Sequence, residues 1–112
     1  MNLQRVRELL KQGAIEFDLS LHALTEARKD GLTTDDLEAA VMSGNLVEDY
    51  GERALLLYFA PDYQIPVHVV LEFMEPDERA TIVTAYVPDR TLWETNWMRR
   101  KRLKSKGKKK KR

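Results

Sequence analysis

The chain contains no cysteine, and this absence excludes several kinds of chemistry. Without a thiol there is no disulfide, no thiolate nucleophile and no cysteine-ligated metal site. The lack of disulfides is compatible with a reducing compartment. The sequence also has no apolar run after a basic start, and no apolar stretch near the roughly 20 residues that a bilayer-spanning helix needs. We therefore predict a cytoplasmic protein and expect no membrane partner.

Motifs for metal, phosphate-loop and nucleophile chemistry are also missing. The chain has two histidines, His22 and His68, but no H-x-x-H or H-E-x-x-H spacing. It has no Gly-rich phosphate loop and no G-x-S-x-G elbow. We therefore predict neither a metal nor a cofactor.

Acidic residues are absent from the last fourteen positions, which we call the basic tail (residues 99–112). Eleven of these fourteen residues are Lys or Arg. The chain has 19 basic residues, so eight remain for residues 1–98, which also hold all 18 acidic residues. The net charge of +1 therefore hides an acidic body and a strongly basic tail. The basic side chains of the tail belong to Arg99, Arg100, Lys101, Arg102, Lys104, Lys106, Lys108, Lys109, Lys110, Lys111 and Arg112.

The composition of the basic tail predicts a disordered segment that binds a polyanion. Its charges repel one another and it has almost nothing apolar to bury. Lys and Arg attract polyanions by releasing the counterions that surround phosphates. We predict RNA or another nucleic acid as the partner. An anionic membrane surface and the acidic body, in the same copy or in another, are the alternative targets.

Hydrophobic periodicity predicts one α+β domain over residues 1–98. Helical spacing predicts a short helix ending near Gly13, and an αα-hairpin follows over residues 21–30 and 34–43. The period then changes to two, which predicts strands. We expect the hairpin to pack on a four- to five-stranded, mostly antiparallel sheet. Trp93 and Trp97 lie at i,i+4 spacing, which predicts a C-terminal helix that covers a sheet edge. The predicted strands are 14–18, 46–50, 54–60, 65–73 and 81–87.

Strand alternation also groups three polar side chains. In the strand from Ile65, the apolar residues at odd positions share one face and His68 points to the other. In the last strand, Thr84 and Tyr86 share a face with Ile82. If both strands set their more apolar face on the helices, His68, Thr84 and Tyr86 converge into a polar cluster able to do acid–base work. The alternative is a lone histidine on an exposed sheet face.

The segment from Ser20 to Leu32 resembles the start of the prokaryotic domain-of-unknown-function family 4258. That family has an S-x-H-A helix followed by an Arg and a turn of Gly and an aliphatic residue. The likeness continues, in order and spacing, over about residues 15–93. It includes Asp36–Val41, Gly44–Tyr50, the strand from Pro66 and Thr84–Asp89 with Trp93 beyond.

The family looks similar to the barnase–EndoU–colicin–RelE-like nuclease superfold, which includes metal-independent ribonucleases of toxin–antitoxin systems. The resemblance implies His22, Arg28, His68, Thr84 and Tyr86 as catalytic positions. The implied reaction is RNA transesterification, with the two histidines as acid and base and with Arg28 offsetting phosphorane charge. An antitoxin-like protein would then be a partner.

Two other readings stay open beside the ribonuclease. The chain is alternatively a non-catalytic nucleic-acid-binding protein that uses its basic tail. In a third reading, the tail clamps the acidic body of the same or another copy, which would make the protein a homo-oligomer. The residues alone favour an ordinary surface role for Arg28 and a packing role for the two tryptophans.

Overall fold

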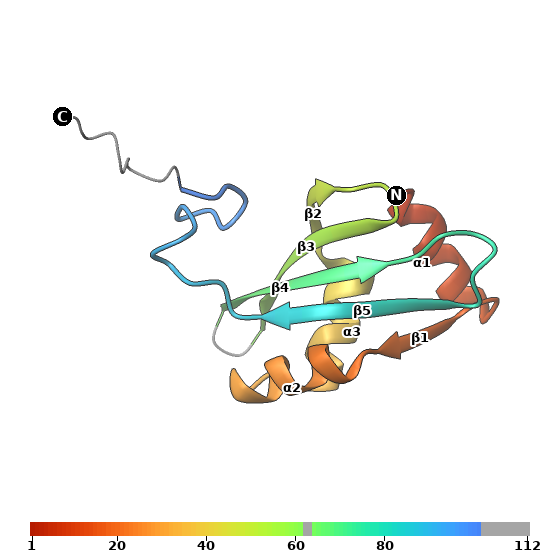
Figure 1. The fold of residues 1–112 in the computed structure, drawn as a ribbon, viewed down its shortest axis with the longest axis horizontal. Coiled ribbons are helices and arrows are strands. Elements are labelled where there is room, and N and C mark those ends of the chain that lie inside the picture. The colour runs from red at the N-terminus through yellow and green to blue at the C-terminus, as the bar shows by residue number, and fades with distance from the viewer. Residues whose placement is uncertain (62–63, 102–112) are drawn as a thin grey trace.

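The computed structural model describes residues 1–61 and 64–101. Within these ranges the chain folds as an α+β domain with three helices and a five-stranded sheet (Figure 1). The strand order is β1-β5-β4-β3-β2, and every neighbouring pair is antiparallel except β1 and β5, which are parallel. The elements are α1 (Leu3–Gln12), β1 (Glu16–Leu19), α2 (Leu21–Lys29), α3 (Thr34–Ser43), β2 (Asn45–Asp49), β3 (Arg53–Ala60), β4 (Ile65–Glu72) and β5 (Arg79–Tyr86).

Local capping chemistry fixes where the helices begin and end. Ser20 accepts a hydrogen bond from the Ala23 amide and starts α2, as predicted. Thr33 and Asp36 form a capping box at the start of α3. Gly13 follows α1 with a φ of 73°, in the left-handed region where glycine carries no Cβ penalty. The three helical segments predicted before the strands are therefore confirmed.

The end of α3 is held by α1. The Arg7 guanidinium donates to the carbonyl oxygens of Val41 at 2.7 Å and Gly44 at 2.6 Å. These carbonyls lie at the helix terminus, where no intrahelical donor reaches them. At Gly44, an added Cβ would lie 2.9 Å from the Leu57 carbonyl oxygen. This close approach of α3 to β3 accommodates only glycine without a backbone shift.

The sheet has a different cover on each of its two faces. The three helices lie on one face, where the main core forms, with Leu37, Leu56 and Leu71 fully buried. The opposite face, which we call the second face, carries a smaller cluster of Leu55, Leu57, Trp93 and Trp97. The cover of the second face is the chain after β5. We call residues 88–101 the Trp strap. Among the described residues, no helix is long and apolar enough to cross a membrane.

The predicted C-terminal helix is wrong, because the Trp strap is built from turns. Asp89 accepts hydrogen bonds from the Thr91 amide and hydroxyl, but the turn does not propagate. The strap closes instead through an isolated bridge between Trp93 and Arg100, and Trp97 has a φ of 62°. Both tryptophans are 7% exposed, so both bury their rings on the second face. This burial overrides the helical spacing, and the strap covers a sheet face rather than an edge.

Candidate functional site

Strand pairing places His68 in the middle of the second face. His68 lies between Leu57 of β3 and Tyr86 of β5 in the sheet register. The register shifts between Val70 and Leu71, which is a β-bulge. Because a bulge inserts one residue, Ile82 and Ala85 both face the helices. The prediction that Ile82 shares a face with Thr84 and Tyr86 is therefore wrong. Thr84 and Tyr86 themselves lie on the second face.

His68 forms the centre of a three-group hydrogen-bond chain. Its Nε2 lies 2.8 Å from the Trp97 carbonyl oxygen and its Nδ1 lies 3.3 Å from the Tyr86 hydroxyl. A carbonyl oxygen can only accept, so Nε2 carries the proton. Nδ1 is then the acceptor of the Tyr86 hydroxyl proton. The Tyr86 side chain, the imidazole and the Trp97 main chain therefore form one directed relay.

Aromatic rings enclose the imidazole. The Trp93 ring meets it edge-on with centroids 4.5 Å apart, and the Tyr86 ring does so at 5.4 Å. His68 is 0% exposed, so the reading of a lone histidine on an exposed sheet face is wrong. Burial lowers the pKa of His68 below its ordinary 6.5, although its bond to the Trp97 carbonyl opposes that shift. The imidazole is accordingly neutral at pH 7.

The hydroxyl end of the relay faces a more open environment. Tyr86 is half-buried, and burial raises its pKa above the ordinary 10.0. The Arg100 charge lowers the pKa of Tyr86 and the Tyr50 phenol raises it, both by less than burial does. Tyr50 itself is 62% exposed. At neutral pH the relay therefore joins two uncharged rings.

Two arginines stack on the strap tryptophans. The Arg90 guanidinium lies 4.7 Å from the Trp97 ring centroid, and that of Arg100 lies 6.0 Å from the Trp93 ring. Both cation–π contacts lie within the Trp strap, and that of Arg100 joins the start of the basic tail to a buried tryptophan. No sequence pattern singles out Arg90, because its spacing from Trp97 carries no signal unless the strap geometry is known.

The structure does not bring all of the predicted catalytic residues together. Thr84 lies on the second face beside Val70, along the strand from the His68–Tyr86 pair. His22 and Arg28 are exposed on α2. Within residues 1–61 and 64–101, no hydrogen bond or ion pair joins either of them to His68 or Tyr86. Their proposed roles in chemistry stay predictions.

The described part of the basic tail comprises Arg99, Arg100 and Lys101, and all three are exposed. The other eight predicted nucleic-acid-binding residues lie outside the described residues. In the part of the chain that the structure describes, no group of three or more His, Asp or Glu side chains is arranged to hold a metal ion.

The pKa shifts of His68 and Tyr86 predict that the free energy of unfolding falls on both sides of a pH range. Because the folded pKa of His68 is lowered, its contribution to the free energy of unfolding is present above pH 6.5 and lost as pH falls through the folded pKa. The raised pKa of Tyr86 acts in the other direction, so its contribution is lost as pH rises above 10.0. Urea unfolding between these limits and beyond them measures the effect. The acid-side loss between pH 6.5 and the folded pKa should vanish in His68→Gln, whose amide does not titrate.

Comparison with known proteins adds a family but no activity. The family model described as Domain of unknown function (DUF4258) matches residues 19–87. No curated protein and no solved structure gave a significant match. The matched residues run from the end of β1 to just past the end of β5 and include His22, His68 and Tyr86. The chain belongs to the DUF4258 family of domains of unknown function.

Proposed function

We propose that this protein binds single-stranded nucleic acid, RNA above all, through a positively charged C-terminal end. The observation that carries this proposal is the junction of the basic tail with the Trp strap. The strap fixes Arg99, Arg100 and Lys101 on the body, and the remaining eight tail cations follow directly in the sequence. The structured domain therefore presents the tail from one defined place.

The cations at this end of the molecule are available to phosphates. The ion pairs within the described residues use the Met1 amine, Arg5, Arg53 and Arg79, and none involves Arg90 or the described part of the basic tail. Arg90 and Arg100 lie over indole rings, which leaves the guanidinium edges free to donate. Phosphate binding here would release counterions without breaking an internal ion pair.

The state of His68 favours binding without catalysis. A general base must reach the proton that it removes. His68 is fully buried, and both of its ring nitrogens already have partners in Tyr86 and Trp97. In this arrangement the imidazole holds the strap in place and does not face a substrate.

A metal-independent ribonuclease of the toxin type is the second candidate. The specific observation in its favour is the His68–Tyr86 hydrogen bond, which joins two of the predicted catalytic side chains. Catalysis would require the Trp strap to leave the second face, so that the Tyr86–His68 relay met a ribose hydroxyl. His22 and Arg28 would then have to act from the exposed side of α2.

One titration separates the two candidates. A fluorescently labelled single-stranded RNA of mixed sequence is titrated with the complete chain in EDTA, and the RNA is then examined on a denaturing gel. We expect a saturable rise in anisotropy and intact RNA. Fragments that disappear in His68→Gln would replace the binding proposal with the ribonuclease. Absence of any anisotropy change would contradict the binding proposal.

A further inference from the structure

The outer edge of β1 is a feature that the proposed function does not use. β1 is an edge strand, paired only with β5. The amides of Glu16 and Ser20 donate to β5 and its preceding turn, at 2.9 Å to Glu78 and 3.0 Å to Ile82. Alternate residues of a strand turn their backbone groups to opposite sides, so the N–H and C=O of Phe17 point away from the sheet. Within the described residues β1 has no strand neighbour on that side, which leaves a template for another strand.

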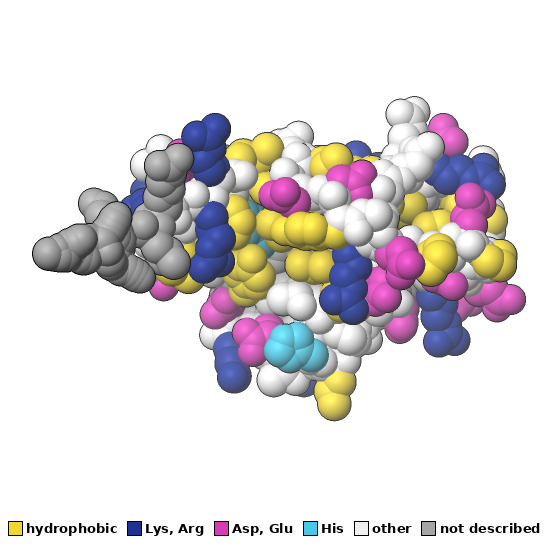
Figure 2. Space-filling view, turned by 45° about the horizontal axis from the view of Figure 1, so that its top comes forward, with side chains coloured by type: hydrophobic (Ala, Val, Ile, Leu, Met, Phe, Trp, Pro, Cys, Tyr) yellow, Lys and Arg dark blue, Asp and Glu magenta, His cyan; other side chains and the backbone are white. Residues whose placement is uncertain are grey.

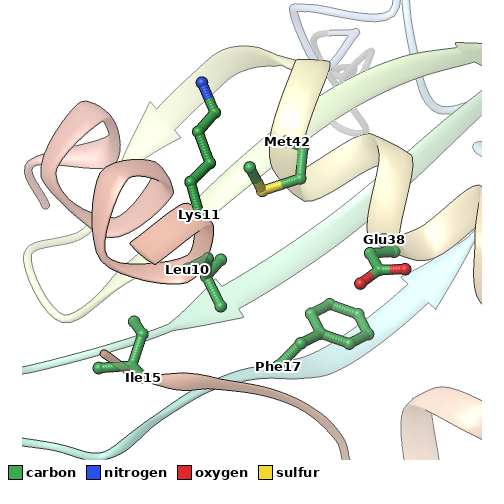
Figure 3. Close-up of a pocket in the computed structure, with 6 residues that line it drawn as sticks. All are labelled: Leu10, Lys11, Ile15, Phe17, Glu38 and Met42. Carbon is green, nitrogen blue, oxygen red and sulfur yellow. The ribbon is translucent and has the colours of Figure 1, made fainter. Parts of the chain in front are cut away.

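A hollow lined by four apolar and two charged residues opens beside this edge, between the sheet and the helices (Figure 3). Its volume is about 240 Å³. Ile15 and Phe17 of the β1 segment form one side, and the other walls come from α1 and α3. In Figure 3 the Lys11 side chain points away from the hollow, and the Glu38 carboxylate lies near the Phe17 ring. The residues that line the hollow are Leu10, Lys11, Ile15, Phe17, Glu38 and Met42. A strand added to β1 would direct every second side chain into this space.

The side chains of β1 that point to the second face are acidic. Ile15 and Phe17 pack on the helix side of the sheet, so Glu16 and Asp18 point to the second face. The Glu16 side chain is 78% exposed, and its ion pair with Arg79 is long, at 3.9 Å. A strand that fits the edge therefore needs an apolar residue for the hollow, flanked by basic residues for the acidic side.

The chain itself contains that pattern. Leu103 is the one large apolar residue in the basic tail, and it lies between Arg102 and Lys104. In an extended segment Leu103 would point to one face and its two basic neighbours to the other. Polyanion binding gives Leu103 no role. A hollow for Leu103 beside two carboxylates for Arg102 and Lys104 would give all three residues a role.

The segment that fits the edge must come from a second copy. The Trp strap and α1, whose Leu10 and Lys11 line the hollow, lie at opposite ends of the molecule (Figure 1). From Lys101, the last described residue, to Leu103 the chain spans at most about 7 Å. We propose that residues 102–104 of one copy add to the β1 edge of another, with Leu103 in the hollow. Such a contact is heterologous, so it extends into a chain of copies or closes into a ring.

Sedimentation velocity of the complete chain over a range of concentrations tests this proposal. We expect association that strengthens with concentration and that Leu103→Ser weakens by at least about tenfold. Met42→Lys, which puts a cation at the hollow, should weaken it similarly. The control is Leu46→Ser, which alters an exposed leucine on β2 and should leave association unchanged.

The same variants separate this proposal from nucleic-acid binding. Leu103→Ser removes no charge, so its affinity for RNA should stay within about twofold of that of the unmodified chain. A complete chain that stays monomeric at all concentrations would overturn the proposal. Association that Leu103→Ser leaves unchanged would overturn it as well.

Discussion

Ending the chain at Lys101 is expected to lower its affinity for single-stranded RNA roughly a thousandfold at about 0.1 M salt. This truncation removes eight of the eleven cations in the basic tail and keeps Arg99, Arg100 and Lys101. Each lost phosphate contact removes a released counterion from the binding equilibrium, and eight such losses multiply. Anisotropy titration of one labelled RNA with both chains measures the ratio.

The position of the cut matters, because the strap reaches into the basic tail. The Glu94 amide donates to the Arg99 carbonyl oxygen and the Lys101 amide donates to that of Leu92. A cut before Arg99 would remove both bonds and the Trp93–Arg100 bridge, and would confound lost charge with a lost strap. The matched control is a complete chain with Ser105→Ala, which should bind as tightly as the unmodified chain. Equal affinity of the truncated and complete chains would contradict the assignment of binding to the tail.

Replacing His68 with alanine is expected to lower the free energy of unfolding by about 3 kcal/mol. The change empties a fully buried site between the Trp93 and Tyr86 rings. It also leaves the Trp97 carbonyl oxygen without the Nε2 donor at 2.8 Å. Because both tryptophans of the chain lie in the strap, their fluorescence reports the strap directly. Emission should shift to longer wavelength in His68→Ala as the indoles meet water.

Two further substitutions check that this effect belongs to the relay. His22→Ala changes the other histidine, which is exposed on α2, and should alter stability by less than about 0.5 kcal/mol. His68→Gln offers an amide that can donate to the Trp97 carbonyl oxygen, and it should recover part of the lost stability. An unshifted tryptophan emission in His68→Ala would show that the imidazole does not hold the strap.

The helices, the strands and one strand face could be predicted because local patterns determine them. Ser20 and Thr33 cap helices through bonds to amides three residues away, and such bonds need no distant partner. The alternation around His68 likewise assigned it to the face opposite the helices. The prediction that His68 lies close to Tyr86 is confirmed by their pairing in the sheet register.

The features that were predicted wrongly depend on contacts between residues distant in the sequence. A β-bulge moved Ile82 to the helix face, and no local pattern around that residue signals it. The burial of His68 comes from a segment about thirty residues later, which turned from its predicted helix to place Trp93 and Trp97 on the second face. Tertiary packing thus buries a candidate catalytic base beneath the Trp strap.

The salt dependence of RNA binding measures the central claim most directly. Figure 2 shows acidic side chains spread over much of the described surface that faces the viewer. An interaction carried by the basic tail should therefore depend strongly on screening by salt. The logarithm of the association constant is plotted against the logarithm of salt concentration for the complete chain and for the chain ending at Lys101. We expect a slope approaching roughly −8 if all eleven tail cations engage, and about −2 for the truncated chain. Equal slopes for the two chains, or binding that salt does not weaken, would contradict it.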